Sequence, residues 1–266
     1  MPNDTGEIFW QKLSWKELEN RLPSVETVLV PCGSVEQHGP HLAMENDSRS
    51  AAVVCEEVAK RMYPRVLVAP HFLLGFSPHM ISKKFPGTIT LRAETFIDIV
   101  LDIAASLQRN GIRSAICVNG HGGNIEPLVI AARRAREELG FHLISLCYWD
   151  FLPSTKLSMI IENYALGAGH GGEFETSIAL ARFSENVKTD LIPPAEVDFS
   201  SDIHSIEGIS LPVYADEFYR FGATDNPRIA TAAKGQQMFD LAVSGLLTFI
   251  EKFVKFEPKF GWHARI

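Results

Sequence analysis

The sequence predicts an α/β protein with a mostly parallel sheet. Four strand-like segments, 27–32, 65–70, 114–119 and 141–148, are apolar along nearly their whole length. Between them lie segments whose apolar residues recur at helical spacing. Strands that are apolar on both sides belong to sheets covered on both faces, so we expect a single three-layer α/β/α domain. No repeat, low-complexity tract or linker divides residues 1–266.

The first half of the chain is expected to contain two helices, two strands and a loop. Ser14 and Glu17 have the spacing of a capping box, which predicts the start of the first helix. Asp47 is a candidate cap for the second helix. In chain order these elements are the helix 14–22, the strand 27–32, the helix 48–62, the strand 65–70 and a loop, 75–88, rich in Gly, Pro and Ser.

In the second half, glycine and proline mark the predicted helix ends. Gly111 and Gly140 are well placed to end two helices, and Pro227 suits the first turn of the last one. The predicted elements are the helix 93–110, the strand 114–119, the helix 125–138, the strand 141–148, the helix 173–183, an irregular segment 184–226 with possible short strands, and the helix 227–255.

The composition is that of an ordinary globular protein with a formal net charge of -7 and 46% hydrophobic residues. Nucleic-acid-binding proteins usually show a basic excess, so we expect no nucleic-acid partner. No stretch approaches the roughly 18 apolar residues in a row that span a membrane, and no signal peptide is visible. The four cysteines share no C-x-x-C spacing, which indicates buried thiols in a reducing compartment. We therefore expect a cytoplasmic protein without a membrane partner.

Three short stretches combine carboxylates, imidazoles and glycines. They are G-S-V-E-Q-H-G-P-H-L-A-M-E-N-D at 33–47, N-G-H-G-G-N at 119–124, and H-G-G-E-F-E-T-S at 170–177. The first of them alone contains Glu36, His38, His41 and Asp47. Oxygen donors mixed with imidazole nitrogens are the ligands that Zn²⁺, Mn²⁺ or Fe²⁺ needs. The sequence therefore predicts a site for a divalent metal.

Two of these stretches directly follow predicted strands. Glu36 and His38 follow the first strand, and His121 follows the third. Ligands of open α/β sheets bind beyond the carboxyl ends of the strands. Glu36 and His38 are two residues apart, so in an extended segment their side chains point the same way. A single His or Glu after a strand is more often a solvated loop residue than a metal ligand. Here several such residues follow two different strands, so chance would have to place each of them independently.

The chain resembles the creatininase (creatinine amidohydrolase) family. The stretch V-P-C-G-S-V-E-Q-H-G-P-H-L, with Asp47 behind it, is similar to the first motif of that family. The stretches 119–124 and 170–177 are similar to its second and third motifs, and F-P-G-T at 85–88 and G-A-T-D-N-P…A-T-A-A-K-G at 222–235 also fit. The resemblance implies a three-layer α/β/α fold, a two-metal site and hydrolysis of a non-peptide C–N bond, often in a ring.

The resemblance also implies which residues hold the two metals. The ligands of one metal would be Glu36, Asp47 and His121, and those of the other His38 and a bridging Asp47. In creatinine-hydrolysing members, a Glu two residues after the second-motif histidine completes the second metal's shell, with an aromatic residue between them. This chain has Gly122 and Gly123 there. The departure removes one expected ligand and one substrate contact, which argues against creatinine as the substrate.

The third motif offers a replacement for the missing ligand. Many relatives whose second motif reads H-G-G-N have, as here, a Glu in the third motif. We therefore expect Glu173 to complete the shell of the second metal and Glu175 to orient a ligand or a helix N-terminus. The alternative for Glu173 is an ordinary first-turn residue stabilised by the helix dipole.

The remaining predicted site residues would act on the substrate. His170 is the candidate general acid and base, because an unperturbed imidazole titrates close to neutral pH. His79 is expected to contact the substrate, although a merely exposed loop histidine is about as good an interpretation. Gly122 and Gly123 are also expected beside the substrate. His41 is expected to be structural, bonding across its own turn.

The predicted function is a metal-dependent amidohydrolase, in which two divalent ions activate a water against a cyclic or formyl amide of a small molecule. The motifs specify the metals and not the pocket, so a deformylase or a sugar-lactone-type hydrolase on the same scaffold remains open. A non-catalytic metal- or nucleotide-binding protein is the alternative from another class. The sequence contains neither G-x-G-x-x-G nor G-K-[ST], the motifs that would indicate nucleotide binding. The resemblance implies a homo-oligomer, commonly a hexamer, with 184–226 as a candidate interface.

Overall fold

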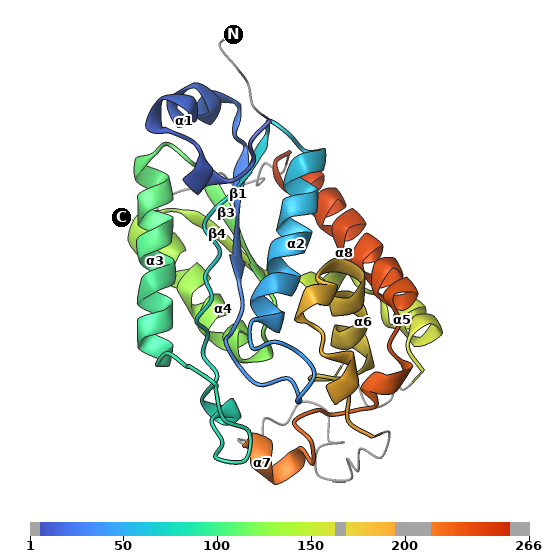
Figure 1. Ribbon diagram of the computed structural model, residues 1–266. Coiled ribbons are helices and arrows are strands. Elements are labelled where there is room, and N and C mark those ends of the chain that lie inside the picture. The colour runs from blue at the N-terminus through green and yellow to red at the C-terminus, as the bar shows by residue number, and fades with distance from the viewer. Residues whose placement is uncertain (1–5, 163–168, 195–213, 256–266) are drawn as a thin grey trace.

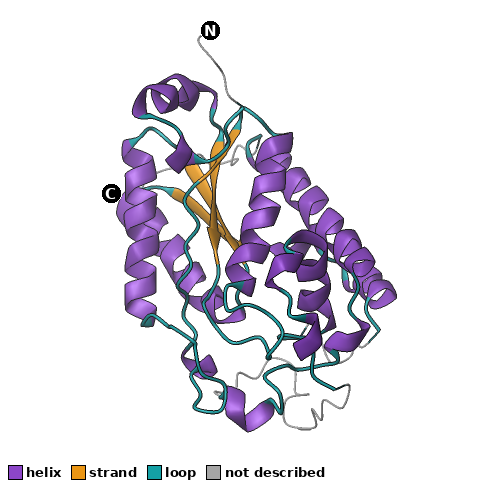
Figure 2. Ribbon diagram, viewed as in Figure 1, coloured by secondary structure: helices purple, strands orange, loops and turns teal. Residues whose placement is uncertain are grey.

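Four parallel strands form the central sheet of the computed structural model, which describes residues 6–162, 169–194 and 214–255. The strands are β1 (Thr27–Cys32), β2 (Val66–Val68), β3 (Ser114–Asn119) and β4 (His142–Cys147), in the order β2-β1-β3-β4. Figure 2 shows helices on both sides of this sheet. The three-layer α/β/α arrangement with a parallel sheet is therefore confirmed.

Alternate residues of each strand enter two separate hydrophobic cores, as the two-residue period of a strand requires. Leu29 and Ile116 face the core formed with α2 (Asn46–Arg61), α6 (Glu173–Arg182) and α8 (Ala232–Phe253). Val28 and Ala115 face the opposite core, formed with α3 (Ala93–Arg109) and α4 (Ile125–Arg134). Burial of a side chain such as Leu29 stabilises the folded state by about 1.5–3 kcal/mol. The apolar residues on both faces of the sheet therefore contribute to the stability of the fold.

Helices α6 and α8 pack against each other more closely than ordinary side chains permit (Figure 1). A Cβ atom on Gly235, in the first turn of α8, would lie 1.8 Å from the carbonyl oxygen of Ser177 in α6. The hydroxyl of Ser177 also accepts a hydrogen bond from the backbone N–H of Thr231. The start of α8 is thus fixed directly against the first two turns of α6.

Several predicted helix boundaries are confirmed and two are wrong. The first helix is α1 (Trp15–Arg21), with both hydrogen bonds of the Ser14–Glu17 capping box. The second, α2, begins at Asn46, so Asp47 lies in its first turn and does not cap it. The last helix, α8, begins at Ala232 because Thr231 caps it by accepting from the N–H of Lys234, whereas Pro227 lies in a separate 3-10 turn.

Short helical segments account for most of what the sequence pattern missed. After β4 come a 3-10 turn, Tyr148–Phe151, and the helix α5 (Ser154–Ile160). The helix α7 (Ala215–Phe218) lies at the same end of the molecule as the loop that follows β1 (Figure 1). Each of these segments is too short to show a clear helical period. The possible strands within 195–213 lie outside the described residues.

No helix in the described ranges is long and apolar enough to cross a membrane. The features that position the site are the carboxyl ends of β1 and β3, the first turn of α2 and the first turn of α6. Loops rich in glycine connect these places, and Gly120 illustrates why. A Cβ atom there would lie 2.1 Å from the carbonyl oxygen of Asp47, so only glycine lets the chain after β3 approach α2 this closely.

Candidate metal centre

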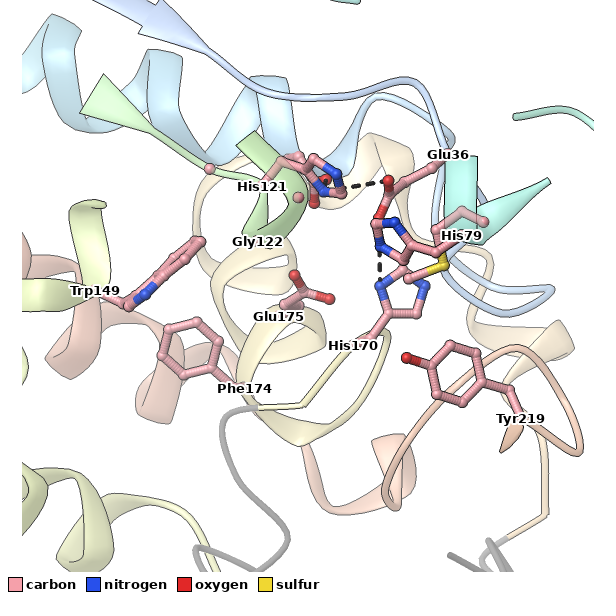
Figure 3. A pocket seen from close by; sticks show the side chains of 13 residues that line it. Glu36, His79, His121, Gly122, Trp149, His170, Phe174, Glu175 and Tyr219 are labelled. Atoms are coloured by element: carbon pink, nitrogen blue, oxygen red, sulfur yellow. Dashed lines mark ion pairs between the residues drawn. The ribbon is translucent and has the colours of Figure 1, made fainter. Parts of the chain in front are cut away.

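Six polar side chains meet at the carboxyl ends of the strands. We call them the ligand cluster: Glu36, His38, Asp47, His121, His170 and Glu175. They form three overlapping groups whose potential ligand atoms lie within 4.8 Å of one another. Figure 3 shows Glu36, His121 and His170 converging, with Glu175 beside them. The structure therefore brings together segments up to about 140 residues apart, as parallel strands ending at one edge of a sheet allow.

Asp47 is shared by two of the three groups. Its Oδ1 atom lies 2.7 Å from Nε2 of His38, and its Oδ2 atom lies 3.0 Å from Nδ1 of His121. Oε2 of Glu36 completes the first group, 3.2 Å from Nδ1 of His121. Oε2 of Glu175 completes the second, 3.5 Å from Nε2 of His38. This arrangement gives each group three donors, with one carboxylate oxygen of Asp47 facing each side.

Each histidine of the cluster has one ring nitrogen next to a backbone carbonyl. Nδ1 of His38 lies 3.1 Å from the carbonyl oxygen of Glu36. Nε2 of His121 lies 3.1 Å from that of Phe76, and Nε2 of His170 is hydrogen-bonded to that of Gln37. A nitrogen that donates to a carbonyl carries the proton, so the other nitrogen is left with a lone pair that faces the cluster.

The electrostatics of the cluster favour a bound cation. Burial alone would lower the pKa of His121, but the adjacent carboxylates of Glu36 and Asp47 outweigh burial and raise that pKa to about 10. Burial also disfavours charge on His38, yet Asp47 and Glu175 hold its pKa well above the ordinary value. The carboxylates thus attract positive charge strongly, as a cation-binding site must.

The donor atoms also fit a metal by their burial. Glu36, His38 and Asp47 are each at most 2% exposed, and Glu36 Oε2, His38 Nε2 and Asp47 Oδ2 face only other members of the ligand cluster. Several buried carboxylates that meet only imidazoles and one another are costly, and a divalent ion would compensate their charge. Among the described residues that line the adjoining cavity there is no Lys or Arg to neutralise the carboxylates instead. Mixed oxygen and nitrogen donors suit Zn²⁺, Mn²⁺ or Fe²⁺.

The two third-motif glutamates have surroundings that differ from those expected from the sequence. The carboxylate of Glu173 faces away from the cluster: Oε1 lies 2.6 Å from Nζ of Lys234, and Oε2 accepts a hydrogen bond from the N–H of Glu162. Glu175 occupies the place among the donors that was expected for Glu173. It also accepts a hydrogen bond from the N–H of Gly171, at 2.6 Å, which holds the preceding turn against the cluster.

A cavity of about 480 Å³ opens beside the ligand cluster. Trp149 and Phe174 lie on one side of it and Tyr219 on the other (Figure 3). His79 also lines the cavity and stacks on the His121 ring, with the ring centroids 5.7 Å apart. Sequence reasoning placed His79 beside the substrate but did not identify Phe174 or Tyr219. Tyr219 lies in a polar, irregular stretch of sequence, where no pattern marked it.

Gly122 and Gly123 both line the cavity, but they differ in their surroundings. A Cβ atom on Gly123 would lie 2.3 Å from the carbonyl oxygen of Phe76 and 2.5 Å from Nε2 of His121. Nothing lies within 4 Å of a Cβ atom on Gly122. Position 123 is therefore closed to any side chain in this arrangement. His41 lies outside the ligand cluster, with Nε2 2.9 Å from the hydroxyl of Thr176.

The parallel sheet and the ligand cluster at its carboxyl edge define an α/β protein with a candidate metal site. More narrowly, the chain belongs to the creatininase family: the family model described as creatinine amidohydrolase matches residues 11–250. The creatinine amidohydrolase of Pseudomonas putida is 31% identical over 262 residues, which cover 92% of this chain and 96% of that protein. A mycofactocin precursor peptide peptidase of Mycobacterium ulcerans is 32% identical over 255 residues, 88% of each chain.

Solved structures agree with this assignment. The crystal structure of a creatinine amidohydrolase (creatininase) superposes with a TM-score of 0.79 at 29% identity, covering 95% of this chain and 99% of that one. Other creatininase structures are described as a zinc–zinc type and as a manganese form. More distant relatives include a 3-dehydro-scyllo-inosose hydrolase of Thermotoga maritima, 26% identical, and a formylamino-pyrimidine deformylase of Methanobrevibacter smithii, 25% identical.

Proposed function

We propose that this protein is a metal-dependent amidohydrolase that cleaves a non-peptide C–N bond in a cyclic or formyl amide. The single observation that carries the proposal is the pair of donor groups that share Asp47 at the floor of an aromatic-walled cavity. Glu36, Asp47 and His121 would hold one divalent ion, and His38, Asp47 and Glu175 the other. When bound, such ions would lower the pKa of a water and polarise the substrate carbonyl.

His170 is proposed as the residue that moves the proton to the leaving nitrogen. Its Nδ1 atom lies 3.5 Å from Oε1 of Glu36, and its ring faces that of His38 with the centroids 4.1 Å apart. The hydrogen bond from Nε2 to the carbonyl oxygen of Gln37 fixes the ring, so that Nδ1 is the nitrogen available for exchange. Proton transfer to a leaving amine requires a titratable group held in place beside the metals, and His170 meets that requirement.

The cavity walls support a small, flat substrate. Trp149, Phe174 and Tyr219 present aromatic surface, and His79 adds a polar group next to His121. Burial lowers the pKa of His79, so its imidazole is neutral at neutral pH and can either donate or accept a hydrogen bond. Gly122, which has open space where a side chain would be, leaves room for the substrate near His121. This combination suits a planar amide with polar edges.

The test combines metal analysis with a panel of amides. The protein is loaded with Zn²⁺ or Mn²⁺ and assayed on creatinine, a formamidopyrimidine, a cyclic sugar derivative and a short peptide. The proposal predicts turnover of a non-peptide amide that stops on chelation and returns when metal is added back. Turnover of the sugar derivative alone would favour the sugar-lactone-type alternative, and turnover of the peptide alone would contradict the bond class. Bound metal without any turnover would support the non-catalytic alternative.

We also propose that the protein is cytoplasmic and works as a homo-oligomer, with a hexamer expected from the family. Its four cysteines are free and buried, which suits a reducing compartment. Ile125, Val129 and Ile130 on α4 are 39–48% exposed and offer apolar surface for self-association. Sedimentation equilibrium tests the assembly, and a mass equal to one chain would contradict it.

A further inference from the structure

The last motif of the sequence, Gly222 to Gly235, contacts the turn that carries two members of the ligand cluster. We call residues 222–235 the clamp segment. It contributes no donor to the cluster, yet it packs along residues 169–177, as the neighbouring segments in Figure 1 show. Its contacts are concentrated on the turn 170–173, between His170 and the start of α6.

Thr224 fixes one end of that turn. Its backbone N–H donates to the carbonyl oxygen of His170 at 2.8 Å, and its hydroxyl lies 3.2 Å from the same oxygen. A Cβ atom on Gly169 would lie 1.8 Å from the Thr224 hydroxyl oxygen. The chain on the N-terminal side of His170 therefore lies directly against the clamp segment.

Asp225 fixes the other end. Its Oδ1 atom accepts a hydrogen bond from the backbone N–H of Glu173 at 3.0 Å. A Cβ atom on Gly172 would lie 1.1 Å from the same oxygen, so the carboxylate occupies the volume that a side chain at 172 would need. Asp225 is 1% exposed, and burial raises its pKa to about 7. Burying a carboxyl group costs free energy unless the group makes hydrogen bonds. The hydrogen bond to the Glu173 amide therefore indicates that Asp225 fixes the position of the backbone at Glu173.

We propose that Asp225 is a positioning residue that fixes the turn 170–173 and thereby places Glu175 within the ligand cluster. The link is short: the turn is held at the His170 carbonyl and at the Glu173 amide, and within it the N–H of Gly171 donates to Oε2 of Glu175. The inference rests on the proposed function, because it predicts that loss of Asp225 weakens the binding of the metal held by His38, Asp47 and Glu175. The group of Glu36, Asp47 and His121 does not depend on this turn.

The experiment titrates metal-free protein with Mn²⁺ and records calorimetry and the paramagnetic resonance spectrum. Wild-type protein should bind two equivalents and show the spectrum of a coupled pair. Asp225→Ala should weaken the second equivalent by about 10- to 100-fold and leave the first unchanged, so that the spectrum becomes that of an isolated ion. Asp225→Asn keeps an oxygen that accepts from the Glu173 amide and should bind both equivalents.

Lys234→Met is the matched control for a general loss of stability around α6. It removes a contact with the side chain of Glu173 but leaves the hydrogen bond from the Glu173 amide to Asp225, so it should still bind both equivalents. Asp225→Ala that binds both equivalents as wild type does would overturn the inference. If Lys234→Met weakens the second equivalent as much as Asp225→Ala does, the inference is also overturned, because weaker metal binding would then follow from lower stability alone.

A substitution at Gly172 keeps the test decisive if Asp225→Ala folds poorly. The φ of Gly172 is −96°, which an alanine adopts freely, so Asp225 is the obstacle to a side chain there. Gly172→Ala should therefore weaken the second equivalent by itself. It should cause no further weakening once Asp225 is alanine, and additive losses would contradict the inference. Wild-type protein that binds only one equivalent would instead overturn the two-metal proposal, and this inference with it.

Discussion

The ammonium of Lys234 lies 2.6 Å from the carboxylate of Glu173, and the glutamate side chain is fully buried. Nζ of Lys234 also lies 3.0 Å from the carbonyl oxygen of Ile229, so the ion pair joins the start of α8 to the start of α6. The ion pair therefore holds the two helices together. This contact is the reason that Glu173 is not available to the ligand cluster.

We expect Lys234→Met to lower the free energy of unfolding by about 3 kcal/mol, because it leaves the buried Glu173 carboxylate without its cation. The additional change Glu173→Gln should restore much of that loss by removing the uncompensated charge. Urea denaturation of the wild-type protein and these two variants measures both effects. As the matched control, Lys16→Met breaks a solvent-exposed pair with Glu19 and should cost less than about 1 kcal/mol. Equal costs for the two lysines would contradict this interpretation.

Glu175→Gln should remove the second equivalent of bound metal, whereas Glu173→Gln should leave both in place. The difference follows from geometry: Oε2 of Glu175 faces His38, while both oxygens of Glu173 are used by Lys234 and Glu162. Elemental analysis after gel filtration measures the metal content of each variant, and circular dichroism checks that each is folded. Loss of metal from Glu173→Gln alone would restore the assignment made from the sequence.

His170→Ala should lower kcat by about 10²-fold with the metal content unchanged. The reason is that Nδ1 of His170 lies 3.5 Å from Oε1 of Glu36, beside the proposed metal site, but the two donor groups that share Asp47 are complete without it. His170 also belongs to a third group, with Glu36 and His38, in which it would act as a ligand. Metal analysis separates the two roles. A fall in bound metal would make His170 a ligand, and unchanged kcat would exclude it from catalysis.

Much of the site was predictable because its residues follow strands. Glu36, His38 and His121 lie at the carboxyl ends of β1 and β3, and a buried parallel strand is readable from its apolar run alone. Asp47 was also found, although its place in the first turn of α2 was not. Residues that directly follow such a strand in the sequence lie at its carboxyl end in the fold.

The choice between Glu173 and Glu175 was not predictable in the same way. On an α-helix, residues two positions apart point in directions that differ by about 200°, so only one of the two can face the cluster. Which one does so depends on the rotation of α6, and that rotation depends on contacts with distant segments, such as the hydrogen bond from the Glu173 amide to Asp225. A pattern read along one segment contains no such information. The same reason explains why Tyr219 was missed.

The neighbouring glycines of the second motif offer a matched pair for the last prediction. Gly123→Ala would place a methyl group against the carbonyl oxygen of Phe76 and the ring of His121. Overpacking of this kind typically costs about 1–3 kcal/mol. Since the His121 ring is one of the groups that must move, we expect weaker metal binding by Glu36, Asp47 and His121 as well. Gly122→Ala meets no atom within 4 Å and should change stability by less than about 1 kcal/mol.

Thermal unfolding and metal titration of both variants, with the same metal, measure these effects side by side. Gly122 lines the cavity, so its alanine variant can raise KM while leaving stability and metal content intact. The clash at position 123 involves His121 and also His79, whose Cε1 atom would lie 2.9 Å from the new Cβ. His79→Ala in the Gly123→Ala background should therefore recover part of the lost metal affinity. Equal behaviour of the two alanine variants would show that position 123 is not closed to side chains, and that the absence of a glutamate there has another cause.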